Sequence, residues 1–266
     1  MIWDLDGNIT RTVSDPGDII VPRVIIRGQW GYVMATSWGV DSALAADKIV
    51  DSDNQTLFDL VRQQCGQEPA FWGRYIGGRY ALTATEAQFL HNGGCKILVI
   101  YNGARDRSSS VQGGFQEGAN DANKAIAAAQ ALGVPFGVWI YADVEAGWKP
   151  TSDWFQGWSD TMFNSQFGDA GGIYGDPHKT NAGNFNVPYC NAFNSDSSMQ
   201  GTDDDAAYIF SSEPEPGCTT AAQAPPFAPD MPPCNPNTVI WQYAENCVGG
   251  RVDEDLANDA GFASMW

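Results

Sequence analysis

Pro135–Gly147 reads PFGVWIYADVEAG and is the clearest structural signal in the chain. Its run of apolar and aromatic residues predicts a buried strand that ends in acidic residues. Side chains alternate along a strand, so Asp143 and Glu145 should point the same way, together with Trp139 and Tyr141. Two carboxylates crowded by each other and by aromatic rings should have raised pKa values, which keeps one acid protonated beside an ionised partner. The alternative is that both acids are simply solvated at a strand end.

Strand and helix signals alternate on both sides of this stretch. Helical patterns occur at 57–64, 83–92, 116–132 and 152–167, and Thr83 with Glu86 forms a capping box at the start of the second. Strands separated by helices imply parallel pairing through right-handed crossovers, and about eight such strands fit the size of a (β/α)8 barrel. The expected strands are 32–41, 70–76, 96–101, 135–147, 172–175, 206–210, 238–243 and 251–253.

Two kinds of segment lie outside this alternation. Residues 1–32 predict a short β arm, either a docking extension or a strand covering the bottom of the barrel, and residues 33–266 the α/β barrel itself. Insertions at 176–205 and 211–237 follow strand ends, so both should lie on the rim that carries active sites in barrels. The Asp203–Asp205 run in the first insertion predicts a solvated turn rather than a calcium site, because no EF-hand spacing surrounds it.

The composition excludes several classes of partner. The chain has 14 basic and 32 acidic residues, a formal charge of -18, which argues against nucleic acid and anionic membrane surfaces. No apolar run approaches the roughly 20 residues of a membrane helix.

Cysteine usage and the start of the chain bear on where the protein works. The six cysteines form no C-x-x-C pair, which with two histidines makes a zinc site improbable, and four lie in the last third of the chain, which favours disulfides in an oxidising compartment. The first residues lack a secretory leader pattern, so we expect either a removed leader or another route, such as a phage particle. The expected location is extracellular or the cell envelope, or alternatively a phage tail. The cysteines are Cys65, Cys95, Cys190, Cys218, Cys234 and Cys247.

Several acids should meet at one end of such a barrel. The C-terminal ends of parallel strands share one mouth, so Asp41, Asp143, Glu145 and Asp253 could converge although they are far apart in sequence. Four acids without a serine or cysteine triad indicate chemistry run by carboxylates, of which glycoside hydrolysis is the commonest kind. Nucleotide-binding glycine motifs are absent, and we expect no cofactor and no metal.

Short motifs in this order resemble those of a known family. WGVDS (38–42), YADVEAG (141–147), GIYG (172–175), WQY (241–243) and VDED (252–255) resemble glycoside hydrolase family 25, the lysozyme-type muramidases. FWGRYIGG, LTATEAQFL and LVIYN resemble more closely the related bacterial glycoside-hydrolase-like domains. The resemblance implies a barrel that cleaves, or descends from enzymes that cleave, the β-1,4 bond after N-acetylmuramic acid in peptidoglycan.

The resemblance also implies roles for individual residues. Glu145 would be the general acid, Asp143 would stabilise the oxocarbenium-like state or orient the acetamido group of the substrate, and Asp41 and Asp253 would complete an acidic floor. Tyr141, Tyr174 and Trp241 are candidates for sugar stacking or for barrel core, and Arg74 is either a substrate ligand or an internal partner of an acid. The full set of expected substrate-binding residues is Tyr141, Tyr174, Trp241, Gln242, Arg74 and Tyr101.

A different class of function fits the same sequence. A non-catalytic glycan-binding or structural protein could keep the barrel, as an envelope protein or phage tail component, with residues 1–32 docked against a protein partner. The hydrolase hypothesis predicts turnover of peptidoglycan, whereas the second predicts binding to cell walls without turnover.

Overall fold

The computed structural model describes residues 36–167, 171–200, 207–235 and 237–266, and within residues 1–35 four short strands. The chain divides into two compact units, Met1–Ala35 and Thr36–Trp266. In the first unit β1 (Ile2–Trp3) pairs with β2 (Ile9–Arg11), and β3 (Arg23–Ile26) pairs with β4 (Gln29–Tyr32), both antiparallel. The Asp203–Asp205 run lies outside the described residues.

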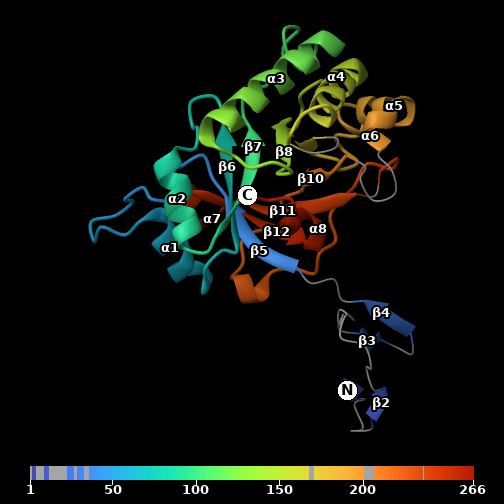
Figure 1. Ribbon diagram of the computed structural model, residues 1–266. Helices are drawn as coiled ribbons and strands as arrows, with labels where there is room; N and C mark the ends of the chain where they lie inside the picture. Colours follow the sequence, from blue (N-terminus) through green and yellow to red (C-terminus); the bar gives the residue numbers. More distant parts are fainter. Residues whose placement is uncertain are drawn as a thin grey trace. The chain divides into compact units, whose positions relative to one another are not determined.

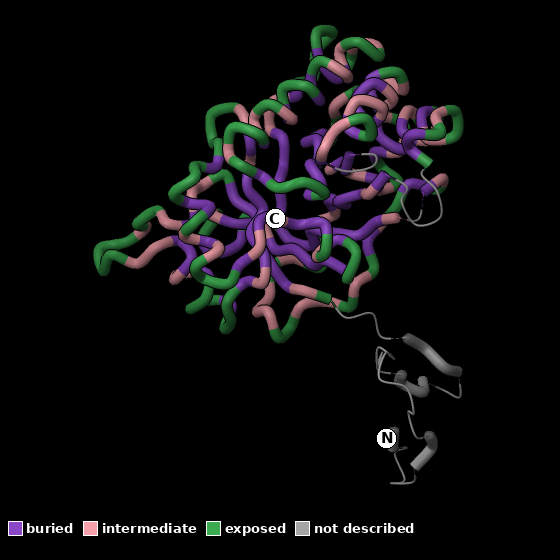
Figure 2. Tube along the Cα trace, in the orientation of Figure 1, coloured by how far each residue is buried: buried purple, intermediate pink, exposed green. Residues whose placement is uncertain are grey.

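The second unit is a closed barrel of eight strands, which neighbour one another in chain order (Figure 1). This confirms the predicted (β/α)8 architecture. The barrel strands are β5 (Thr36–Asp41), β6 (Phe71–Ile76), β7 (Lys96–Tyr101), β8 (Ile140–Asp143), β9 (Gly172–Gly175), β10 (Ile209–Ser212), β11 (Thr238–Asn246) and β12 (Val252–Asn258). Their residues are almost all buried, which makes the barrel the core of the unit (Figure 2).

Helices pack around the barrel and cover its outer face (Figure 1). Predicted helix starts agree with the side-chain caps, since Thr56, Thr83 and Thr151 each accept a hydrogen bond from the third backbone N–H that follows. The helices are α1 (Leu57–Cys65), α2 (Ala84–Asn92), α3 (Phe115–Leu132), α4 (Ser152–Phe163), α5 (Asn186–Ser195), α6 (Ser197–Gln200), α7 (Cys247–Gly250), α8 (Asp259–Ala263) and the 3-10 turn η1 (Ala221–Gln223).

One strand runs against the predicted direction. β12 is antiparallel to both of its neighbours, β11 and β5. Residues 247–251, which connect β11 to β12, are too few for the crossover that a parallel pair requires. The eighth strand is also longer than the predicted 251–253 and carries the chain back to the N-terminal end of the parallel strands. There the backbone carbonyl of Ser264 accepts a hydrogen bond from Trp139 N at 3.0 Å, so the segment after β12 lies across the bottom of the barrel.

Two disulfide bonds fasten the rim insertions, as the cysteine pattern predicts. Cys190 pairs with Cys234 and Cys218 pairs with Cys247. The first joins the two insertions to each other, and the second joins the Pro-rich insertion to the β11–β12 connection. No helix among the described residues is long and apolar enough to cross a membrane.

Candidate active site

The four predicted acids come together at the mouth of the barrel. Asp41 ends β5 and lies directly opposite Asp253 of β12 in the strand register. Asp143 ends β8 and lines one small pocket with Asp41. Glu145 follows β8 and lies close enough to Asp253 and Asp143 for their charge and hydrogen bonding to affect its carboxyl. Asp253 reaches the mouth as the second residue of an antiparallel strand, not from the end of a parallel one.

Glycines on the inward face make room for Asp41. A Cβ on Gly73 of β6 would lie 2.4 Å from Asp41 Cβ, closer than two side chains can approach. One layer further down, a Cβ on Gly39 would lie 2.5 Å from the carbonyl oxygen of Phe71. The carboxylate is then held by Gln242, whose Nε2 donates to Asp41 Oδ2 at 2.8 Å. Asp41 is thus fixed by packing on one side and by a hydrogen bond on the other.

The four acids differ in exposure, and this separates what each can do. Asp41 and Asp143 are both 2% exposed, Asp253 is half-buried, and Glu145 is exposed. Between the two buried acids the structure leaves a void of about 10 Å³, enough for about one water molecule. Glu145 is therefore the acid that a bulky substrate can reach, whereas Asp41 and Asp143 lie behind it.

Burial and mutual repulsion raise the pKa values of these acids. Burial and the charge of Glu145 raise the pKa of Asp143 to about 8, although a hydrogen bond from Asn102 Nδ2 opposes the shift. Partial burial raises the pKa of Glu145, and the charge of Glu245 adds to this. Asp143 and Glu145 also share a side-chain hydrogen bond. The pair therefore favours a protonated carboxyl near neutral pH, and burial favours the protonated form most strongly at Asp143.

The opposite wall of the mouth shows the same effect. Burial raises the pKa of Asp253 to about 6, and Glu245 adds to this while the N–H of Asn246, donating to Asp253 Oδ1 at 2.7 Å, opposes it. Burial followed by the charge of Asp253 raises the pKa of Asp41 well above its ordinary value. Glu145 therefore faces a wall formed by Asp41 and Asp253, and both of these carboxyl groups have raised pKa values.

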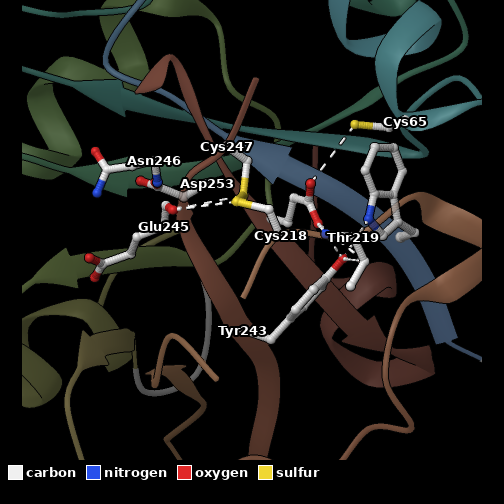
Figure 3. The surroundings of a disulfide bond; sticks show 10 residues. Cys65, Cys218, Thr219, Tyr243, Glu245, Asn246, Cys247 and Asp253 are labelled. Carbon is white, nitrogen blue, oxygen red and sulfur yellow. Dashed lines mark hydrogen bonds between the residues drawn. A yellow bond between two sulfur atoms is a disulfide. The ribbon is translucent and has the colours of Figure 1, made fainter. Parts of the chain in front are cut away.

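A disulfide supports this wall (Figure 3). Cys247 directly follows Asn246, and its bond to Cys218 ties the Pro-rich insertion to the connection that precedes Asp253. Next to the disulfide, Glu254 accepts hydrogen bonds from Tyr243 Oη at 2.8 Å and from the backbone N of Thr219 at 2.9 Å. The insertion is thus held against the outer face of β11 and β12.

Of the six expected substrate-binding residues, two lie at the mouth. Tyr174 lines the pocket and donates to Gln242 Oε1 at 2.9 Å. Ser212 Oγ donates to the same oxygen at 3.1 Å. Gln242 is thereby oriented with its N–H group toward Asp41, and Tyr174 presents a partly exposed ring beside the acids.

The other four expected substrate-binding residues lie away from the mouth. Tyr141 is fully buried and its hydroxyl lies 3.4 Å from Ser264 Oγ, at the bottom of the barrel. Trp241 points outward, because Gln242 points inward, and its Nε1 donates to the carbonyl of Glu213 in the Pro-rich insertion.

Tyr101 and Arg74 both lie outside the barrel. Tyr101 stacks on Trp158 of α4, and Arg74 pairs with Glu86 of α2. Arg74 is therefore an internal partner of an acid, but that acid is Glu86 and not one of the four at the mouth. None of these four residues offers a surface to a sugar at the mouth.

Sequence reasoning missed several residues of the mouth. Tyr75 and Ile100 line the pocket, and the alternation of side chains in β6 and β7 would have selected them in place of Arg74 and Tyr101. Asn102 could have been found because it follows a predicted strand directly. Asp255 stands in the VDED motif, two residues after Asp253, so alternation would have selected it as well. Residues with no isolated signal are Phe210, Ser212 and Glu245.

Asp255 lies deeper in the barrel, paired in register with Gly39 and Gln242. It is completely buried, and neither carboxyl oxygen has a hydrogen-bond partner among the described residues. Burial, then the charges of Asp41 and Asp253, raise its pKa well above the ordinary value. Asp255 is thus a completely buried acid beneath the mouth, and its surroundings disfavour the ionised form.

Potential metal ligands gather at one further place on the rim. Ligand atoms of His178, Glu213 and Asp230 lie within 4.8 Å of one another, and all three side chains are partly exposed. His178 Nε2 lies 3.9 Å from Asp230 Oδ2, and Asp230 N donates to Glu213 Oε2 at 2.9 Å. These contacts account for the cluster without an ion.

Comparison with known proteins places the chain in a family. The sequence profile of the Rv2525c-like, glycoside hydrolase-like domain matches residues 67–255. An uncharacterized protein of B. stearothermophilus is 31% identical, with a TM-score of 0.73 over 86% of this chain and 100% of that one. No curated protein matches the chain.

Two more distant structures share the fold. The Tat-secreted protein Rv2525c of Mycobacterium tuberculosis, in complex with L-tartrate, is 16% identical, with a TM-score of 0.54 over 86% of this chain and 98% of that one. The modular autolysin LytC of Streptococcus pneumoniae, in complex with a synthetic peptidoglycan ligand, is 14% identical with a TM-score of 0.50, over 96% of this chain and 55% of that one. The profile match covers β6 to β11, the first four residues of β12 and three of the four mouth acids, and the chain therefore belongs to the Rv2525c-like, glycoside hydrolase-like domain family.

Proposed function

We propose that the protein is a glycoside hydrolase that cleaves β-1,4 bonds of peptidoglycan in the manner of a muramidase. The observation that carries this proposal is the convergence of Asp41, Asp143, Glu145 and Asp253 at one mouth, where burial raises the pKa values of Asp143 and Glu145. Acid-catalysed glycoside cleavage requires a carboxyl that is protonated near neutral pH and within reach of the leaving oxygen. Asp143 holds a proton but is buried, whereas Glu145 is exposed, and the hydrogen bond between them provides the transfer.

In this mechanism Glu145 is the general acid. It receives the proton from Asp143 and delivers it to the glycosidic oxygen as the bond to the anomeric carbon breaks. A water molecule then adds to the anomeric carbon and gives a proton back to the Glu145 carboxylate. Asp143, now ionised and held by Asn102, stabilises the positive charge that develops on the sugar ring or orients the acetamido group. Asp41 and Asp253 form the opposite wall of the mouth and supply the acidic floor that the resemblance implies. The partly exposed rings of Tyr75 and Tyr174 stand beside the acids and supply aromatic surface for a sugar bound above the small void.

The location that fits this function is extracellular or the cell envelope. Two disulfides are typical of an oxidising compartment, and the relative Rv2525c is described as Tat-secreted. Peptidoglycan strands as the substrate fit LytC, whose structure holds a synthetic peptidoglycan ligand. We further propose that residues 33–266 are the hydrolase unit and that residues 1–32 dock against a protein partner.

The test is product analysis. Purified peptidoglycan incubated with the protein should release fragments with new N-acetylmuramic acid reducing ends, identified by mass spectrometry after borohydride reduction. New N-acetylglucosamine ends would replace the muramidase assignment with a glucosaminidase.

A second candidate function is a non-catalytic glycan-binding barrel. The void of about 10 Å³ behind Glu145 and the cover over Trp241 both favour it, because they leave little room for a sugar below the rim. Binding to cell walls in a pull-down with no new reducing ends would establish this candidate and reject the hydrolase.

A further inference from the structure

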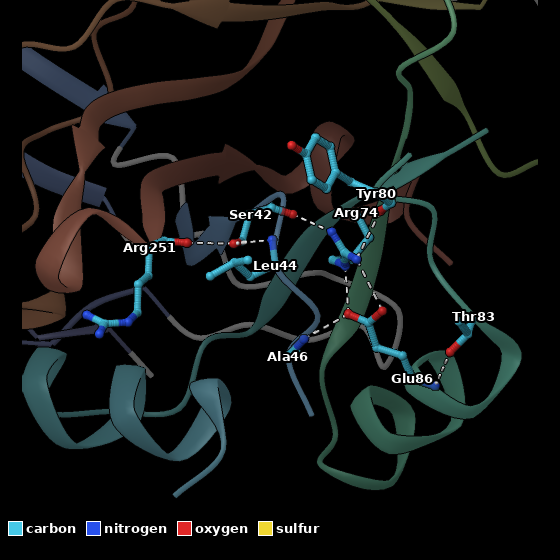
Figure 4. Close-up of polar contacts among 8 residues, drawn as sticks. All are labelled: Ser42, Leu44, Ala46, Arg74, Tyr80, Thr83, Glu86 and Arg251. Atoms are coloured by element: carbon cyan, nitrogen blue, oxygen red, sulfur yellow. Dashed lines mark hydrogen bonds and ion pairs between the residues drawn. The ribbon is translucent and has the colours of Figure 1, made fainter. Parts of the chain in front are cut away.

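An ion pair is buried outside the barrel between β6 and α2 (Figure 4). The side chains of Arg74 and Glu86 are 2% and 1% exposed. Arg74 Nε donates to Glu86 Oε1 at 2.6 Å and Nη2 donates to Glu86 Oε2 at 3.2 Å, so the contact is bidentate. The geometry is that of a strong charge-assisted pair with no access to solvent.

The remaining hydrogen bonds of the pair go to backbone groups of loops at the mouth. Arg74 Nη1 donates to the carbonyl of Ser42, and Nη2 also donates to the carbonyl of Tyr80 at 3.2 Å. Glu86 Oε1 accepts from the backbone N of Ala46 at 2.8 Å. The pair therefore ties the loop after β5 to the loop after β6, and both loops to the start of α2.

These bonds act on the segment that carries Asp41. Ser42 directly follows Asp41, and its hydroxyl donates to the carbonyl of Arg251 at 2.6 Å while accepting from Leu44 N at 2.9 Å. Arg251 stands two residues before Asp253. One continuous set of bonds thus runs from Arg74 through Ser42 to the backbone on either side of the wall formed by Asp41 and Asp253.

Stability alone does not explain the pair. Taking two charges out of water costs several kcal/mol per ion, and replacing buried pairs by apolar residues is often neutral or stabilising. Glu86 also departs from the predicted capping box: Thr83 Oγ1 accepts from Glu86 N at 3.1 Å, while the Glu86 carboxylate turns to Arg74 and Ala46. The Glu86 carboxylate therefore bonds to Arg74 and to the loop after β5, and not to the backbone N–H groups at the start of α2.

We infer that Arg74 and Glu86 are positioning residues that hold Asp41 in place through the carbonyl of Ser42. The functional part of this inference rests on the proposed hydrolase activity. A displacement of about 1 Å in a reacting constellation can cost about 10²-fold in rate. Loss of the pair should therefore lower kcat strongly while KM changes little, because Asp41 lies behind the exposed Glu145 and contributes little to ground-state binding.

The experiment compares three variants with wild type. Arg74→Met/Glu86→Leu removes both charges and all the loop contacts, and Arg74→Lys keeps a charge beside Glu86 but loses the planar fork that reaches both carbonyls. Arg62→Met removes two exposed ion pairs, with Asp59 and with Glu68, and serves as the matched control. We expect kcat to fall about 10²-fold in the double variant and at least about tenfold in Arg74→Lys, with KM within about threefold of wild type and the control unchanged. If Arg74→Lys restores both stability and kcat, the pair is only structural and the inference fails.

A second readout separates this inference from the proposed function. In the double variant, and in Arg74→Lys if the double variant does not fold, the amides of Leu44 and Ala46 should exchange with deuterium at least about tenfold faster than in wild type, with exchange in β7 unchanged. If wild type lacks turnover, the hydrolase proposal fails, while faster exchange in the variants still supports the positioning role of Arg74 and Glu86. Unchanged exchange at both amides would overturn that positioning role even if wild type is active.

Discussion

Replacement of Asp143 by Asn should remove the pH dependence of stability that this carboxyl contributes. Asp143 is 2% exposed, and its pKa rises from 3.8 to about 8 on folding. Between these pH values the unfolded chain releases the proton and the folded protein retains it, so stability falls as the pH rises. A difference of about 4 pKa units at about 1.4 kcal/mol each gives a loss on the order of 5 kcal/mol between pH 4 and pH 8. The stabilising contribution is complete below the unfolded pKa and disappears as the pH passes the folded one.

Asn keeps the shape and the hydrogen-bond acceptor for Asn102 but carries no titrating proton. The Asp143→Asn variant should therefore match wild type near pH 4 and exceed it by several kcal/mol at pH 8. Urea unfolding of both proteins at pH 4, 6 and 8 measures the difference directly. Parallel stability curves for the two proteins would show that Asp143 ionises normally and would refute the shared proton.

Three further outcomes follow from the mouth and the rim. Glu245→Gln removes a charge that raises the pKa of Glu145, so the basic limb of the pH–rate profile should move to lower pH, whereas an unmoved limb would show that Glu245 does not act on the acid. Gly73→Ala places a Cβ 2.4 Å from Asp41 Cβ, so the free energy of unfolding in urea should fall by about 1–3 kcal/mol and kcat should decrease. Wild-type values for both quantities would show that Asp41 can shift to accommodate the methyl group. Reduction of the two disulfides, which close loops of 44 and 29 residues, should lower the free energy of unfolding by about 3–4 kcal/mol each, and an unchanged urea midpoint in dithiothreitol would contradict their role.

The sequence predicts the barrel because its strands and helices alternate with clear local signals. β7 and β9 have the predicted bounds, and α1 and α3 differ from prediction by one residue at one end. α5 was not anticipated, because its segment is polar and rich in Asn. Its buried residues Tyr189 and Ala192 pack against the rest of the fold, and Cys190 is fixed by a disulfide to Cys234. Tertiary contacts outweigh weak helix propensity there.

Side-chain direction explains most of the differences at the site. Arg74 and Tyr101 occupy predicted strands, but they point outward while their neighbours Tyr75 and Ile100 line the pocket. A resemblance to a family indicates which strands contribute residues to the site. The alternation of side chains along each strand decides which of those residues face the mouth. Asp253 reaches the mouth although its strand direction was predicted wrongly, because an antiparallel strand begins where its parallel neighbours end.

The most direct measurement is the initial rate of release of reducing ends from peptidoglycan by wild type and Glu145→Gln. Glu68→Gln, an exposed acid paired on the surface with Arg62, serves as the control. The shared-proton mechanism predicts that Glu145→Gln loses at least about 10²-fold in rate with an unchanged midpoint of thermal unfolding, while the control keeps the wild-type rate. A Glu145→Gln variant that hydrolyses peptidoglycan as fast as wild type would contradict the mechanism.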